Sequence, residues 1–225
     1  MSLATLLVAL PLALALVTYV LPEGRRAAAL LGGASQVAAV VLLAERTVDR
    51  GGLSLNLGGW PAPPGIAWSV DGLGILFLAL TAFVFGVVSL YALAFWRKSP
   101  GRADAERAFW PLWWLLWAGM NALFLTGDAF NAYVALELIG LAAVALVAAI
   151  DELPALRAAL RYLVVSLAGS LAYLAGVALL YGSYGVLDMG ALAAAITDRP
   201  SAYAALALIT SGLLLKLALF PLHLW

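Results

Sequence analysis

The chain has 225 residues, of which 65% are hydrophobic and only 11% are charged. A soluble domain has roughly 25% charged residues, so this composition excludes a water-soluble globule and predicts an all-α integral membrane protein. Twelve Lys and Arg balance twelve Asp and Glu, cysteine is absent and histidine occurs once. The balance gives no basic excess for nucleic acid, and the missing cysteines exclude disulfides and cysteine-ligated iron–sulfur clusters. We expect no cofactor and no metal site in this chain.

Seven apolar runs are long enough to cross a ~30 Å hydrocarbon core as helices at ~1.5 Å rise per residue. Their predicted limits are 3–21, 27–44, 70–95, 108–126, 128–150, 155–181 and 201–222. The first run lacks a preceding basic region and is long for a signal-peptide core, so we interpret it as a retained span. Pro111, Pro154 and Pro200 stand in predicted first turns, where a missing N–H is harmless.

The long connection 45–69 is rich in glycine and proline, which predicts turns or a short hairpin on the outer face. Trp60 and Trp68 are candidates for an aromatic belt at the membrane surface. We interpret this connection as an interfacial loop without chemistry. It belongs to a first part, 1–107, with three helices, and a second part, 108–225, holds helices four to seven.

Lysine and arginine predict the orientation, because they concentrate in cytoplasmic connections. The first, third and fifth connections hold Arg25, Arg26, Arg97, Lys98, Arg102, Arg107, Arg157 and Arg161, whereas the opposite side holds Arg46, Arg50 and Arg199. We therefore expect a multi-pass protein of the cell inner (plasma) membrane with its N-terminus outside. This anchoring also accounts for Arg157 and Arg161.

Glu137 lies in the middle of the fifth run, roughly 14 Å below its outer end at helical rise. An ionisable group at that depth costs roughly 2.5 to 3.5 kcal/mol and indicates a functional site by default. Its protonation responds to the distance of a nearby cation, so it can act as a switch; the alternative is a permanently protonated packing group or a static ion pair. Tyr133, one turn earlier, is placed to hydrogen-bond the carboxyl group. Asp128 faces the other way and, with Asn131, is typical of a helix start.

Lys216 is the matching cation, within the seventh run. Gly212, one turn before it, leaves room for a neighbouring helix or a water file, and Pro221 predicts a break one turn later. Broken helices at membrane depth often line ion paths. The alternative is that Lys216 extends its amine to the inner interface. His223 is either a proton-relay group or an interfacial residue.

The sixth run carries small residues at helical spacing, which favour close helix packing. They are Ser166, Gly169, Ser170 and Gly176.

Three stretches resemble one family. The sequence at 127–138, Gly-Asp-Ala-Phe-Asn-Ala-Tyr-Val-Ala-Leu-Glu-Leu, resembles the fifth-helix motif of the antiporter-like membrane subunits of complex I, Mrp-type antiporters and membrane-bound hydrogenases. The pattern Leu-Lys-x-x-x-x-Pro-x-His-x-Trp at 215–225 resembles their seventh-helix motif, and Ala-Leu-Arg-Tyr-Leu at 159–163, with Arg161, is also similar.

The resemblance implies the N-terminal half of a proton-translocating, fourteen-helix inverted-repeat fold, with 108–225 as an incomplete first repeat and the seventh helix broken near Pro221. It implies that Glu137 and Lys216 form a charge pair whose separation drives proton transfer, with His223 at the broken helix. Tyr133, Pro221, Arg161 and Asp128 are supporting residues. Members are about twice as long, so the resemblance also implies that this chain lacks the exit side of the path. It leaves open whether the chain is a truncated sequence, the product of a split gene or a functional short subunit.

We therefore expect a non-redox membrane subunit of an NADH:quinone oxidoreductase-like, hydrogenase-like or Mrp-type complex, which conducts protons or also sodium. Its expected partners are other membrane subunits and the lipid bilayer, and any flavin, iron–sulfur cluster or quinone belongs to partner subunits. The alternative is a truncated accessory subunit that conducts no ions. An unrelated seven-helix receptor or enzyme finds no support, since no ligand pocket or catalytic cluster is visible.

Overall fold

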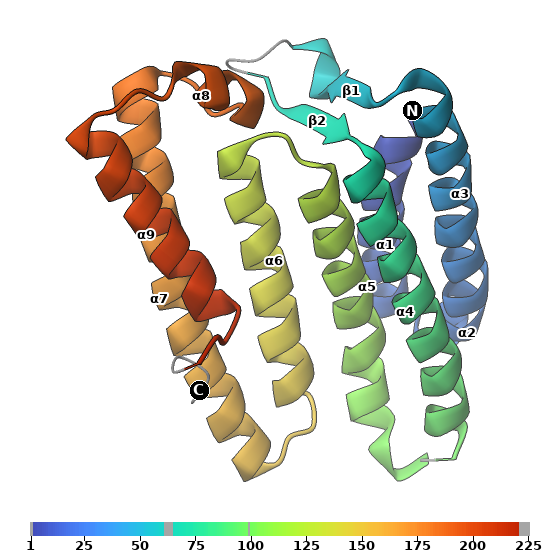
Figure 1. Ribbon diagram of the computed structural model, residues 1–225. Helices are drawn as coiled ribbons and strands as arrows, with labels where there is room; N and C mark the ends of the chain where they lie inside the picture. Colours follow the sequence, from blue (N-terminus) through green and yellow to red (C-terminus); the bar gives the residue numbers. More distant parts are fainter. Residues whose placement is uncertain (1, 61–64, 99, 221–225) are drawn as a thin grey trace.

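The computed structural model describes residues 2–60, 65–98 and 100–220, and it is a bundle of long helices with a small two-stranded sheet at one end (Figure 1). Six helical segments of the described chain are long and apolar enough to cross a membrane. The elements are α1 (Leu3–Val20), α2 (Arg25–Ala27), α3 (Gly33–Arg50), β1 (Leu53–Asn56), β2 (Ala67–Val70), α4 (Gly72–Arg97), α5 (Ala103–Leu125), α6 (Ala129–Ala148), α7 (Leu153–Tyr184), α8 (Met189–Ala195) and α9 (Pro200–Lys216).

The prediction of an all-helical membrane fold is confirmed, with four changes in detail. The second span is longer than expected, because a π-helical turn, Ala28–Gly32, joins α2 to α3 and makes Pro22–Asp49 one segment of 28 residues. α5 begins at Ala103, so Pro111 lies inside the helix and not in its first turn. The short helix α8 was not predicted, and α9 has 17 residues, fewer than the other spans.

The predicted hairpin is present between α3 and α4. β1 and β2 pair antiparallel, with Leu53 opposite Val70 and Asn56 opposite Ala67. Trp60 is 66% exposed, but Trp68 is only 5% exposed. Trp68 is therefore a core residue, and its prediction as a belt residue was wrong: side chains alternate along a strand, and this one faces the helices.

Backbone pairing joins the hairpin to the loops at the same end of the bundle. The Gly127 N–H donates to the Ala67 carbonyl at 3.1 Å, and the Met189 N–H donates to the Gly127 carbonyl at 2.8 Å. The Ala129 N–H donates to the Leu187 carbonyl at 2.9 Å. These bonds satisfy irregular backbone near the membrane without help from water, and they fix the position at which α6 begins.

The first of two apolar cores fills the space among α1, α3, α4 and α5. Its large side chains come from α5, where Trp114 and Trp117 stack at 5.2 Å and Phe85 of α4 stacks on Trp113 at 4.3 Å. The Trp113 indole N–H donates to the Ser89 hydroxyl at 2.9 Å.

The second core lies among α6, α7, α8 and α9. α5 and α6 touch between the two cores, where Gly119 allows the backbone of Ile139 to come close.

A proline inside α1 leaves one backbone carbonyl without its helical hydrogen-bond donor, and a side chain of another helix supplies the donor. Pro11 has no N–H, so the carbonyl of Leu7 loses its helical donor. The side-chain amide of Asn121 on α5 donates to that carbonyl at 2.8 Å and to the Gln36 side-chain oxygen on α3 at 3.0 Å. Asn121 and Gln36 are both 0% exposed. This contact ties three helices together at a point that no water reaches from outside.

The end of the seventh predicted helix differs from the expectation. α9 ends at Lys216 and not at 222: the Leu217 N–H still bonds to Leu213 at 2.9 Å, but Ala218 has a φ of 50°. The physical reason is that a helix cannot run smoothly into Pro221, which lacks an N–H and restricts the residue before it. The helix therefore ends at the lysine itself. Pro221 and His223 lie outside the described residues.

Replacing Asn121 with Leu should lower the free energy of unfolding by about 1–3 kcal/mol, because the buried Leu7 carbonyl and Gln36 amide oxygen lose their donor. Denaturant unfolding in detergent measures the change. The informative control is the double variant N121L/P11A, since alanine restores an N–H to the Leu7 carbonyl. We expect the second change to recover a large part of the loss, and an additive further loss would contradict the assignment.

Candidate charged site

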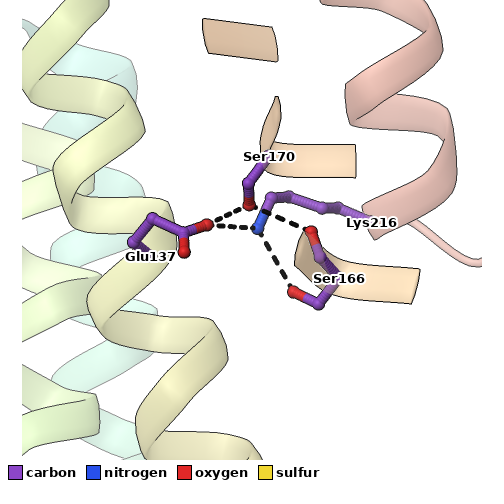
Figure 2. Close-up of polar contacts among 4 residues, drawn as sticks. All are labelled: Glu137, Ser166, Ser170 and Lys216. Carbon is purple, nitrogen blue, oxygen red and sulfur yellow. Dashed lines mark hydrogen bonds and ion pairs between the residues drawn. The ribbon is translucent and has the colours of Figure 1, made fainter. Parts of the chain in front are cut away.

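Glu137, Ser166, Ser170 and Lys216 meet between α6, α7 and α9 (Figure 2). Glu137 is the ninth of the 20 residues of α6, and Lys216 is the last residue of α9. Ser166 and Ser170 stand one turn apart on α7. Each helix therefore presents its polar group to the same point, well away from the helix ends of α6 and α7.

The amine and the carboxylate form a direct contact. Lys216 Nζ lies 3.4 Å from Glu137 Oε1, and the two side chains are 12% and 18% exposed. A charge this far from water is costly unless it has a partner of opposite sign and further hydrogen bonds. The pair predicted from the sequence is therefore present in the structure as a mutual contact, and Lys216 does not extend away to an interface.

Two serine hydroxyls complete the site. The Ser170 hydroxyl donates to Glu137 Oε1, and Lys216 Nζ donates to the Ser166 hydroxyl oxygen at 3.4 Å. Ser170 also lies 3.0 Å from the backbone carbonyl of Ser166, a second acceptor for the same proton. The packing role predicted for these two serines was thus incomplete, because both also contact the charged pair.

Glycines set the distance between the helices that carry the site. A Cβ atom added at Gly169 would lie 2.9 Å from the Gly212 carbonyl oxygen, and one added at Gly212 would lie 2.8 Å from the Tyr173 backbone nitrogen. α7 and α9 therefore approach backbone to backbone one turn before the lysine. On α6, a Cβ at Gly140 would lie 3.0 Å from the Ser166 hydroxyl and 3.9 Å from Lys216 Nζ, so this glycine keeps open the space beside the amine.

A cavity of about 230 Å³ adjoins the pair. Its wall includes Lys216, Ser166, Gly140 and Tyr162, together with apolar residues of α5, α6 and α9. The space is larger than one water molecule needs, and it has polar groups to bind water. The cavity therefore offers room for water beside the amine of Lys216.

The other predicted residues have different places. Asp128 caps α6, since its carboxylate accepts the Asn131 N–H at 2.7 Å, as expected for a helix start. Tyr133 packs with the second core and its ring lies 5.9 Å from that of Phe130; within the described chain it makes no hydrogen bond to Glu137. Arg161 has an exposed side chain on α7.

Sequence reasoning missed the polar role of Ser166 and Ser170. One signal was available: both lie on the face of α7 that carries Gly169, the face predicted to approach another helix. A hydroxyl on such a face lies within reach of any polar group on that neighbour.

Comparison with known proteins gives the family. The family model described as "NADH:quinone oxidoreductase/Mrp antiporter, TM" matches residues 126–225. This region begins just before α6 and contains all four residues of the charged site. Residues 126–225 belong to this family.

Curated family relatives extend the likeness toward the N-terminus. "NADH-quinone oxidoreductase subunit N" of Desulforudis audaxviator is 40% identical over 190 residues, or 82% of this chain and 37% of the relative. A subunit of a probable K(+)/H(+) antiporter of Rhizobium meliloti is 36% identical over 76% of this chain and 31% of the relative. The chain thus spans about a third of the length of the curated relatives that it matches.

Solved structures show the same fold for nearly the whole chain. The Mrp complex from Dietzia sp. matches 98% of this chain and 41% of its own, with a TM-score of 0.84 and 27% identity. A chain of the archaeal membrane-bound sulfane sulfur reductase matches 99% of this chain and 46% of its own, with a TM-score of 0.79 and 31% identity. The chain is thus a multi-pass membrane protein, and nearly its whole length is similar to chains of multi-subunit membrane complexes.

Replacing Gly212 with Ala should lower the free energy of unfolding by about 1–3 kcal/mol, because the added methyl group meets the backbone of α7 and forces the helices apart. Denaturant unfolding in detergent measures this change in the free energy of unfolding. Gly182→Ala is the matched control: it lies on α7 with nothing within 4 Å of an added Cβ, and should be neutral or slightly stabilising. Equal losses in both variants would contradict the packing argument.

Proposed function

We propose that this chain is a proton-translocating membrane subunit in which Glu137 and Lys216 form a protonation switch. The observation that carries the proposal is their 3.4 Å contact, made at the middle of α6 and at the end of α9. Nothing in the packing of the bundle requires charges there, because apolar side chains of similar volume would fill the space at lower cost.

The contact makes the protonation of Glu137 depend on the position of the amine. With Lys216 adjacent, the carboxylate anion is favoured; if the amine moves away, the buried anion loses its main partner and binding of a proton becomes favourable. Lys216 is well placed to move, because it is the last residue of α9 and the chain after it is no longer helical. A change in their distance therefore loads or unloads one proton.

The two serines support both states of such a switch. Ser170 donates to the carboxylate while Glu137 is ionised, and Ser166 provides the amine with an oxygen acceptor besides the carboxylate. Hydrogen bonds of this kind lower the cost of keeping either charge in the membrane. The cavity beside Lys216 would hold the water through which protons arrive or leave.

The similar proteins and the charges in the connections between helices support a proposal for the membrane, the orientation and the partners of this chain. We infer that the chain lies in a cell inner (plasma) membrane with its N-terminus outside, because the arginine-rich connections face the cytoplasm in most membrane proteins. Its partners are other membrane subunits, as in the multi-subunit complexes that contain similar chains. Any flavin, iron–sulfur cluster or quinone would belong to those partners, and protons, or sodium in addition, would be the transported ions.

Replacing Glu137 with Gln in the assembled complex should lower proton pumping at least about tenfold, because the amide keeps the shape but cannot bind and release a proton. Pumping into sealed vesicles is the measurement. Glu152→Gln is the control: Glu152 is 61% exposed and pairs with Arg102 at 3.7 Å, away from the site. Pumping at the control rate in E137Q would overturn the proposed function.

Replacing Ser170 with Ala should also slow pumping, by about tenfold, because a hydrogen bond to a charged group is worth ~1.5 kcal/mol or more. Ser211→Ala is a close control, since the Ser211 hydroxyl also bonds a backbone carbonyl of its own helix, at 2.7 Å from Ala207, but is exposed. If both alanine variants pump alike, the Ser170 contact has no part in transfer.

A further inference from the structure

A long groove runs between α1 and α5, on the side of the molecule away from the charged site. Its volume is about 980 Å³, and it continues past Pro22 and Arg107 into a smaller polar space of about 430 Å³. The polar space lies where α1 ends and where α2 and α5 begin, so it is at one end of the bundle (Figure 1). The groove therefore has an apolar body within the membrane and a polar mouth at its surface.

The apolar body has the form of a binding site for an alkyl chain. It is lined by Leu12, Leu16, Val20, Pro111, Leu112 and Leu115. From Leu12 to Val20 the wall extends ~12 Å along α1 at helical rise. Leu16 and Val20 are 64% and 61% exposed, so nothing in the described chain fills the groove.

The mouth carries charges of both signs in equal number. Three arginines and three carboxylates surround the two spaces: Arg25, Arg26, Arg107, Glu23, Asp104 and Glu106. Arg25 and Glu106 form an ion pair at 4.0 Å, and the Nε atom of Arg25 is buried without a hydrogen-bond partner in the described chain. Arg26 and Arg107 are exposed and form no ion pair with another described residue.

One further acceptor stands at the mouth. Pro111 lies inside α5 and lacks an N–H, so it offers no helical donor to the carbonyl of Arg107. The mouth thus presents guanidinium donors beside carboxylate and carbonyl acceptors. A purely anionic headgroup would be attracted by the arginines but repelled by the carboxylates. A headgroup with a phosphate and an ammonium group has a charge complementary to each.

We propose that this groove binds one zwitterionic phospholipid of the ethanolamine type. The phosphate contacts Arg107 and Arg26, the ammonium contacts Asp104 and the neighbouring acceptors, and an acyl chain lies along α1 and α5. Charge complementarity selects this occupant over an anionic lipid. The bound lipid would fill a groove beside the α1–α5 contact that combines an apolar channel with a charged mouth.

Native mass spectrometry of the full chain, loaded with equal amounts of phosphatidylethanolamine and phosphatidylglycerol, tests the proposal. We expect one retained phosphatidylethanolamine in preference to phosphatidylglycerol. Arg107→Gln should weaken its retention about fivefold, the value for one phosphate contact near the membrane surface. Asp104→Asn should shift the preference toward phosphatidylglycerol, because it removes an acceptor for ammonium. Arg157→Gln, an exposed arginine of α7 outside the groove, should change neither ratio.

A second measurement needs no variant. Phosphatidylethanolamine with a photoreactive acyl chain should label peptides of α1 and α5 that contain Leu12 and Leu112 more than the exposed apolar face of α4. Equal retention of both lipids, retention of phosphatidylglycerol alone, or even labelling of all lipid-facing helices would overturn the proposal. Groove residues that remain unlabelled in the assembled complex would show that a protein segment covers the groove, which would overturn it as well.

Discussion

The absence of water inside the hydrocarbon core is the constraint on which this structure depends. A polar group there must find its partner within the protein, since an unpaired one costs several kcal/mol. The Leu7 carbonyl, left without a donor by Pro11, is bonded by Asn121 from a different helix. The charged groups of Glu137 and Lys216 find each other and two hydroxyls. In both cases a local polar group determines which helices must touch, and apolar packing then fills the remaining space.

The same constraint explains why much of the fold was predictable. The length of an apolar run is set by membrane thickness, so the spans could be located, and the glycine- and proline-rich loop gave the hairpin. Glu137 and Lys216 stood out because charges are rare at that depth, and the contact expected for them is found. His223 and Pro221, predicted from the resemblance, lie outside the described residues, and the roles of Tyr133, Arg161 and Asp128 in proton transfer remain predictions.

Other features could not be predicted because they depend on which helices are neighbours. A proline inside α1 implies a carbonyl without a helical donor, but the sequence does not reveal that the Asn121 side chain donates the hydrogen bond to it. Serine suits a tightly packed helix face and a hydrogen bond to a charge equally well, so Ser166 and Ser170 could be assigned to either role. The proline at position 221 predicted a break in the last helix, but that α9 ends as early as Lys216 could be located only from the folded chain.

The hydroxyl of Ser170 lies within reach of two acceptors, Glu137 and the Ser166 carbonyl, but carries a single proton. It can donate to only one of them at a time. Turning from one to the other is a rotation about one C–O bond that moves no heavy atom, and motions of that size belong to the fastest in proteins. Changing the distance between Lys216 and Glu137 instead requires the heavy atoms of the lysine side chain, at the end of α9, to move. The rate of a cycle would then be set by that larger movement, and the hydrogen bonds around the carboxylate would adjust to it quickly.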